Sequence, residues 1–211
     1  MKYLKMFGLA AVAAVALALL GAGSASATVL CKENIVPCTE AKVYPAKTNV
    51  TATVEPKTSM VFKDTGGNTL NTCLGSRIEG ETENVGSKEK AVIIPLAQLS
   101  FFECTFATFV RELGKLEIDY TGPETRGTFT LKKTKVTINT GIFGSCVYGV
   151  GEPAIDIGTA KGTTEKPATL TVSTVVSKLE GAVCPLTVVW GASYEFTEPT
   201  PLYFKEKISG E

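Results

Sequence analysis

Apolar and polar residues alternate in short runs along most of the chain. The clearest runs cover residues 50–54, 116–120, 170–176 and 190–196. A period of two, with abundant Thr and Val, is typical of antiparallel strands that are buried on one face. The alternation therefore predicts a chain built mainly of strands.

Turn residues separate these runs. Pro56 ends the first run, residues 64–68 read Asp-Thr-Gly-Gly-Asn, and Pro199 and Pro201 follow the last long run. Helical periodicity is nearly absent after residue 27. Strands spaced by about 8–12 residues with turns between them predict an all-β fold, either an antiparallel β-sandwich or a sandwich-like barrel.

The first 27 residues have the pattern of a secretory signal peptide. Lys2 and Lys5 precede an apolar run of about 15 residues, and small residues lead up to Ala27. This run is shorter than the ~20 residues of a transmembrane helix. We therefore expect residues 1–27 to be removed. The product is expected to be secreted, either extracellular or in the cell envelope, and not membrane-spanning after processing.

The remaining residues divide into two parts. Residues 28–48 are expected to form a loop-like lead-in, and residues 49–211 an all-β domain. Two segments of that domain each open with a cysteine and carry a second one later. This similarity also allows two related halves, 49–122 and 123–203.

The chain contains six cysteines and no histidine. An even number of cysteines behind an export signal favours disulfides, and six cysteines allow fifteen pairings. Zinc sites have closer cysteine pairs than any found here, so we expect neither a metal nor a cofactor. Because loop-closure entropy favours partners that are near in sequence, the expected disulfides are Cys31–Cys38, Cys73–Cys104 and Cys146–Cys184.

The near balance of basic and acidic residues limits the kinds of partner that we expect. Without Lys2 and Lys5, the 21 basic residues become 19, against 21 acidic ones. A protein that binds phosphates needs a concentrated basic surface. We therefore do not expect a nucleic-acid partner.

Several short motifs carry a resemblance. They are Ala-Thr-Val-Leu-Cys at 27–31, Thr72-Cys73-x-Gly75, residues 142–149, Cys184-Pro185, Trp190-x-Ala192-x-Tyr194 and residues 199–203. In these motifs the chain resembles a family of uncharacterised secreted, cysteine-containing proteins of soil actinobacteria. The resemblance implies export and a bacterial envelope or extracellular setting, and it implies no activity.

Catalytic chemistry has little support in the sequence. Without histidine, Ser-His-Asp and Cys-His systems are excluded. Glu117 and Asp119 alternate with apolar residues on one strand, so both point to the same face. Such a pair could serve a secreted, glycosidase-like hydrolase. The alternation itself favours the simpler interpretation that both carboxylates lie on the solvent-facing side.

Two regions are candidates for a binding surface. The stretch 99–109, if extended, is apolar on both faces and carries Phe101 and Phe109, and the Gly-rich loop 141–151 carries Phe143 and Tyr148. A buried central strand or a local bend at 99–109, and buried packing or a tight turn at 141–151, are the simpler interpretations of these aromatic residues, and Trp190 is expected in the core. The main hypothesis is a non-enzymatic β domain with a binding or structural role. Its partner would be an extracellular polymer, a protein or a small apolar ligand.

Overall fold

We describe the protein from a computed structural model. The described residues are 28–87, 90–122, 126–141, 143–150, 153–164 and 166–206. The signal peptide expected at residues 1–27 lies outside them. Within the described ranges, no helix has the length and apolar character needed to cross a membrane.

Strands make up most of the described chain. In chain order the elements are β1 (Thr28–Cys31), the short 3-10 helix η1 (Glu40–Lys42), β2 (Asn49–Val54), β3 (Met60–Lys63), β4 (Thr69–Glu81), β5 (Val92–Cys104), β6 (Thr108–Glu112), β7 (Lys115–Gly122), β8 (Arg126–Lys132), β9 (Thr134–Asn139), β10 (Ser145–Val150), β11 (Ile155–Lys161), β12 (Thr169–Glu180), β13 (Thr187–Glu198) and β14 (Tyr203–Glu206).

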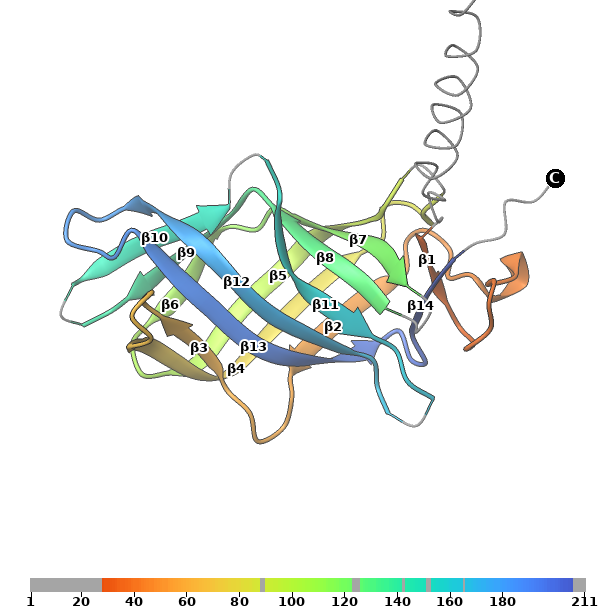
Figure 1. The fold of residues 1–211 in the computed structure, drawn as a ribbon, viewed down its shortest axis with the longest axis horizontal. Coiled ribbons are helices and arrows are strands. Elements are labelled where there is room, and N and C mark those ends of the chain that lie inside the picture. Colours follow the sequence, from red (N-terminus) through yellow and green to blue (C-terminus); the bar gives the residue numbers. More distant parts are fainter. Residues whose placement is uncertain are drawn as a thin grey trace, which may run out of the picture.

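Eight long antiparallel strands close into a barrel (Figure 1). β4, β5, β12 and β13 are single barrel strands, while β2/β3, β6/β7, β8/β9 and β10/β11 each form one barrel strand from two consecutive elements. Neighbours in the barrel follow each other in sequence, and β13 pairs with β2 and β3 to complete the circle. The all-β antiparallel prediction is confirmed. Of the two predicted architectures, the chain adopts the barrel.

Local backbone bends divide two of the composite strands, β6/β7 and β8/β9. Lys133, between β8 and β9, has a positive φ of 54°, and Gly114, between β6 and β7, has a φ of 66°. A Cβ atom at Gly114 would overlap the carbonyl oxygen of Lys132, so glycine is required there. Such interruptions bend the strand and increase its twist, which helps a sheet to close.

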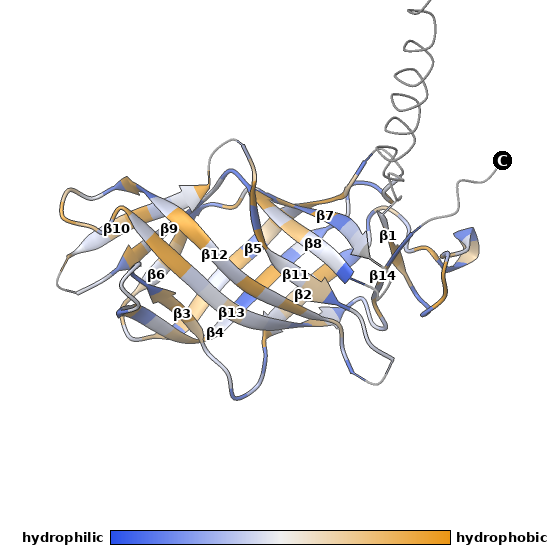
Figure 2. Ribbon diagram, viewed as in Figure 1, coloured by the Kyte–Doolittle hydropathy of each residue, from blue (hydrophilic) through white to orange (hydrophobic). Residues whose placement is uncertain are grey.

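The barrel interior is filled by alternating apolar side chains. In β12 and β13, every second residue is buried over most of the strand, as the alternation in the sequence predicts. Figure 2 shows the resulting bands of hydrophobic and hydrophilic residues along the strands. Eight strands enclose a space that side chains just fill or that holds one small ligand.

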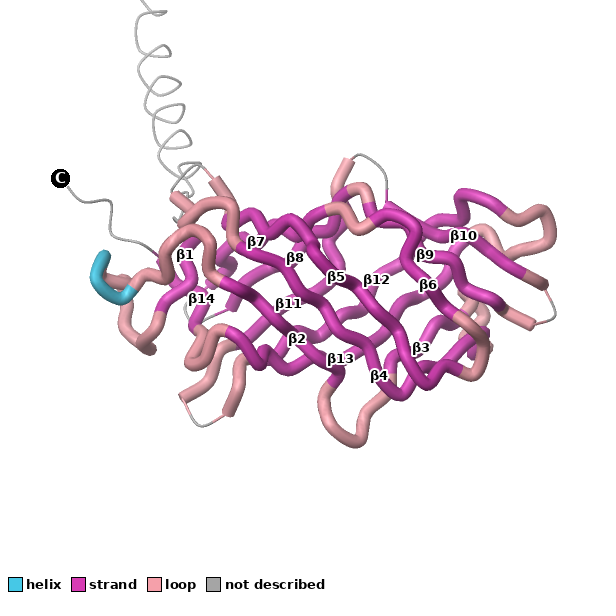
Figure 3. The backbone as a smooth tube through the Cα atoms, turned by 180° about the vertical axis from the view of Figure 1, so that it is seen from behind, coloured by secondary structure: helices cyan, strands magenta, loops and turns pink. Residues whose placement is uncertain are grey.

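One end of the barrel, here called the proximal end, is covered by the small sheet of β1 and β14 (Figure 3). Phe204 of β14 packs on Phe129 and Phe196 from the barrel wall. The ring centroids of Phe204 lie 5.6 Å and 5.9 Å from theirs. The opposite end, here called the distal end, carries the β3–β4, β5–β6, β9–β10 and β12–β13 loops.

The expectation of a loop-like lead-in at residues 28–48 is wrong for its first residues. Thr28–Cys31 form strand β1, and Thr28 pairs with Glu206 at the other end of the described chain. All four residues of β1 are buried, so the strand shows no alternation. Its partner is far away in sequence, and local patterning does not reveal such a pairing.

The three disulfides join the predicted partners. Cys31–Cys38 closes the loop after β1, Cys73–Cys104 links paired positions of β4 and β5, and Cys146–Cys184 ties β10 to the β12–β13 loop. The last two bonds lie in the distal half of the barrel. They hold together strands and loops that surround the distal opening.

The proposed halves, 49–122 and 123–203, divide the barrel between β7 and β8. Four barrel strands fall in each half. The disulfide of the first half joins two paired strands, whereas that of the second joins a strand to a loop. An internal repeat therefore stays a prediction.

Candidate functional site

An apolar cavity lies inside the distal half of the barrel. Its free volume is about 20 Å³, room for about one water molecule, although the apolar walls offer water few partners. Phe62, Phe101, Ile138, Val176 and Trp190 are among the residues that line it.

Three aromatic rings form one wall of this cavity. Phe62 of β3 and Trp190 of β13 are cross-strand partners, with ring centroids 6.4 Å apart. Phe101 of β5 meets both rings edge to face, at 6.0 Å from Phe62 and 6.4 Å from Trp190. Edge-to-face contacts at this spacing are favourable. The wall therefore offers an aromatic surface to any small apolar group beside it.

The polar side-chain atoms of the lining are few. The Thr134 hydroxyl donates to the Leu113 carbonyl at 2.7 Å, and the Tyr148 hydroxyl donates to the Pro185 carbonyl at 3.2 Å. The Trp190 indole N–H is buried without a hydrogen-bond partner among the described residues. Burial raises the pKa of the nearby Tyr194 phenol, and Ser76 and the Trp190 indole partly oppose this rise. The lining thus favours an apolar molecule, with at most one acceptor for the indole N–H.

The barrel wall is not hydrogen-bonded between β5 and β6, although these strands are consecutive. On the proximal side, Leu96 N–H donates to the Gly114 carbonyl at 3.1 Å. On the distal side, the chain leaving β5 bonds back to β4 through Thr105 N–H and the Thr72 carbonyl. We call the unpaired stretch between these two points the seam. Phe101 lies on its β5 edge and is half-buried.

The stretch 99–109 contains a turn and is not the single extended strand considered above, since β5 ends at Cys104 and β6 begins at Thr108. The Asn71 side chain holds the turn between β5 and β6 by two hydrogen bonds. Its Nδ2 donates to the Phe106 carbonyl at 2.7 Å, and its Oδ1 accepts from Phe106 N–H at 3.0 Å. Phe101 and Phe109 consequently belong to different strands. Phe101 lines the cavity, whereas Phe109 points outward and is 53% exposed.

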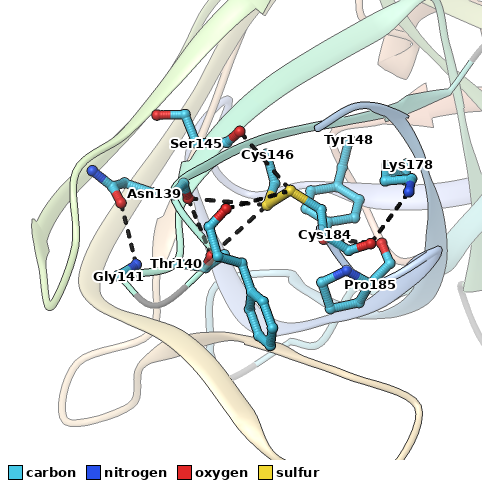
Figure 4. The surroundings of a disulfide bond; sticks show 11 residues. Asn139, Thr140, Gly141, Ser145, Cys146, Tyr148, Lys178, Cys184 and Pro185 are labelled. Atoms are coloured by element: carbon cyan, nitrogen blue, oxygen red, sulfur yellow. Dashed lines mark hydrogen bonds between the residues drawn. A yellow bond between two sulfur atoms is a disulfide. The ribbon is translucent and has the colours of Figure 1, made fainter. Parts of the chain in front are cut away.

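In the second predicted binding region, the loop 141–151, the placement of Tyr148 on a binding surface is wrong. β10 begins at Ser145, so Tyr148 belongs to a strand and not to the Gly-rich loop, and its side chain is only 1% exposed. Figure 4 shows Tyr148 beside Pro185 and the Cys146–Cys184 disulfide. Tyr148 therefore forms part of the cavity wall, and it cannot contribute to an outer surface. Phe143, in the β9–β10 loop, is half-buried against the core.

Burial of Tyr148 leads to a pH prediction. Burial raises the pKa of its phenol from 10.0 to about 12, so the folded state favours the neutral form. The contribution of the neutral Tyr148 phenol to the free energy of unfolding is fully present below pH 10. It is lost as the pH rises from about 10 to 12, by up to about 3 kcal/mol at 1.4 kcal/mol per pKa unit. Urea unfolding at pH 9, 10 and 11 should show this decline. Tyr148→Phe should show a shallower one, and equal declines in both proteins would contradict the prediction.

The carboxylate pair considered for hydrolysis lies on the outer face of β7. Glu117 is held by Lys132 at 2.8 Å and Lys115 at 3.2 Å. Burial alone would raise the pKa of Glu117, but hydrogen bonds from both lysines outweigh it and the pKa is lowered. Partial burial and the charge of Glu117 raise the pKa of Asp119. The pKa values of Glu117 and Asp119 are thus shifted in opposite directions, as in catalytic acid–base pairs. However, neither residue lines the cavity, and Glu117 is ion-paired with two lysines.

Sequence reasoning missed two features of this region. Phe62 is not among the residues singled out above, because nothing in the sequence places it opposite Trp190. Val183 and Leu186 were also missed, although apolar residues in a turn between two alternating strands are an unusual signal. Among the described residues, no group of three or more Cys, Asp or Glu side chains could hold a metal ion.

Searches of family models, curated proteins and solved structures return no match to this chain.

Proposed function

We propose that the protein is a non-enzymatic binding protein that holds a small apolar molecule in the distal half of its barrel. The observation that carries this proposal is the aromatic, almost entirely apolar cavity that reaches the seam at Phe101. Closed eight-stranded barrels are wide enough for one small ligand. The disulfides and the export pattern of the sequence support an extracellular or envelope setting, and the resemblance described above supports a bacterial one.

Entry of the ligand requires movement of Phe101. The closed cavity is too small for a ligand of more than one or two atoms, since its free volume is about 20 Å³. Phe101 is half-buried and lies at an unpaired edge, whereas Phe62 and Trp190 are buried. We infer that Phe101 rotates outward through the seam and that the ligand takes the place of its ring.

The vacated space determines the ligand class. A ligand in the position of the Phe101 ring would contact Phe62 and Trp190 at the spacing that Phe101 now has. A flat ring or a short branched chain of similar size would fit best, and a charged group would be buried without a partner. We therefore propose an uncharged molecule, or an apolar group of a larger molecule, as the ligand.

Trp190 is the only tryptophan of the chain, so it reports on the cavity directly. Titration with bromobenzene, whose bromine quenches indole fluorescence on contact, should give saturable quenching. Phe101→Ala should bind the probe at least about tenfold more tightly, a difference of 1.4 kcal/mol. Val176→Leu, which adds a methylene to the cavity wall, should abolish the quenching.

The neighbouring residue provides a matched control. Phe102 lies on the same strand but on the outer face, 48% exposed and over Gly75. Phe102→Ala should bind bromobenzene within about twofold of the unmodified protein, because it leaves the cavity intact. The proposal is wrong if neither the unmodified protein nor Phe101→Ala shows saturable quenching, or if both alanine variants behave alike.

A further inference from the structure

The distal end exposes apolar side chains at the tips of its loops. In the β12–β13 loop, Val183 is 68% exposed and Leu186 is 75% exposed. Phe106 of the β5–β6 loop is also exposed, and Leu179 lies at the end of β12. Figure 2 shows the β12–β13 loop as a hydrophobic projection at the end of the barrel. Clustered exposed apolar residues mark an interaction site more often than single ones do.

Three of the four distal loops lie against each other. The ring of Phe106 covers Gly141, where a Cβ atom would approach its Cζ to 2.8 Å. The sulfur of Cys184 lies 4.0 Å from the carbonyl oxygen of Phe143. The β5–β6, β9–β10 and β12–β13 loops thus form one surface, which we call the apolar tip. The fourth loop, residues 64–68, is polar.

The apolar tip contains no charged residue. No Asp, Glu, Lys or Arg occurs in residues 104–110, 136–151 or 181–194. Two ion pairs on the barrel wall border the tip, and the exposed Glu103 precedes its first segment. Arg111 contacts Glu180 at 3.0 Å, and Lys135 contacts Glu112 at 2.7 Å. The three loops therefore present uncharged, mainly apolar side chains, with Glu103 and the Lys178 ammonium at their edges.

A disulfide and hydrogen bonds hold the β12–β13 loop of the tip in its exposed position. The Cys146–Cys184 disulfide fixes the β12–β13 loop to β10, and Lys178 N–H donates to the Leu186 carbonyl at 2.8 Å. The Lys178 ammonium also donates to the Cys184 carbonyl at 3.3 Å. Val183 and Leu186 are thus presented to solvent by a braced loop. A partner would gain contact with them without first ordering the segment.

We propose that the apolar tip inserts into the surface of a lipid layer. The three loops lie at the same end of the elongated barrel (Figures 1 and 3), where the β12–β13 and β9–β10 loops project farthest. A protein partner is usually held by hydrogen bonds and a polar rim as well. Lipid chains need neither, which matches a tip of uncharged, protruding side chains. An apolar ligand of the cavity would also be concentrated in such a layer.

Flotation with vesicles of neutral phosphatidylcholine tests the proposal on the full mature chain. The protein should float with the vesicles, and addition of 0.5 M salt, which shortens the screening length to roughly 4 Å, should not release it. Val183→Asp and Leu186→Asp should each weaken binding at least about tenfold, because each removes the burial of one aliphatic side chain. Both positions are exposed, so the fold should be retained, which near-ultraviolet circular dichroism can verify.

Val36 offers a matched control, since it is 59% exposed in the loop closed by Cys31–Cys38 at the proximal end. Val36→Asp should bind vesicles like the unmodified protein. Equal loss in Val36→Asp and Val183→Asp, or no flotation of the unmodified protein, would overturn the proposal. So would self-association in solution that Val183→Asp abolishes, because a second copy would then cover the tip. Quenching of Trp190 by bromobenzene without vesicles tests the cavity separately, so either proposal can fail alone.

Discussion

Replacing Phe129 by alanine is expected to lower the free energy of unfolding by about 3–5 kcal/mol, the range measured for large buried aromatic residues. Phe129 is completely buried where β8, β13 and β14 meet. Its ring centroid lies 5.8 Å from that of Phe196 and 5.6 Å from that of Phe204. The change would leave a cavity between the barrel wall and the sheet that covers its proximal end.

Urea or guanidinium unfolding measures this loss, with Phe102→Ala as the control. Phe102 is the same residue type on the outer face, where about 1 kcal/mol or less is expected. Equal losses at the two positions would mean that the proximal aromatic cluster does not stabilise the barrel. A smaller loss for Phe204→Ala than for Phe129→Ala would show that the β14 sheet contributes less than the wall.

Removal of either long-loop disulfide is expected to lower stability more than removal of the short-loop one. The loops span 38 residues for Cys146–Cys184, 31 for Cys73–Cys104 and 7 for Cys31–Cys38. Loop-closure entropy then predicts losses of about 4, 4 and 2 kcal/mol respectively, since a longer loop leaves the unfolded chain more freedom when it is opened.

Paired Cys→Ala variants, unfolded in denaturant under non-reducing conditions, test this order. Removing Cys146–Cys184 should also weaken vesicle binding, because the β12–β13 loop would lose its connection to β10. Removing Cys31–Cys38 should leave vesicle binding unchanged. A larger loss of stability from the seven-residue loop than from the two longer ones would contradict the entropic argument.

The disulfide pairing could be predicted because the fold is a meander. Each barrel strand lies beside its neighbour in sequence, so cysteines that are close in sequence are also close in space. The burial of Trp190 could be predicted for a similar reason, since its same-face neighbours Ala192, Tyr194 and Phe196 are apolar. Both predictions needed only local information.

The candidate site required more than local information. Phe101 was singled out because the stretch around it is apolar, but the turn that ends its strand is held by hydrogen bonds between Asn71 and Phe106, 35 residues apart. Tyr148 was assigned to a flexible loop because glycines flank it, and the strand that contains it is defined by pairing with β9 and β12. In both cases the deciding contact comes from a distant part of the chain.

By itself, the sequence determined the alternation of buried and exposed positions and the strands that follow from it, and it favoured the cysteine pairs, because each depends on residues near one another along the chain. Only the tertiary structure decided that the sheet closes through β13 and β2, that β1 pairs with β14, and that the wall is unpaired at the seam. The same holds for the cavity between Phe62, Phe101 and Trp190. These features depend on contacts between residues far apart in sequence, and a pattern with a period of two is the same whichever strand lies alongside.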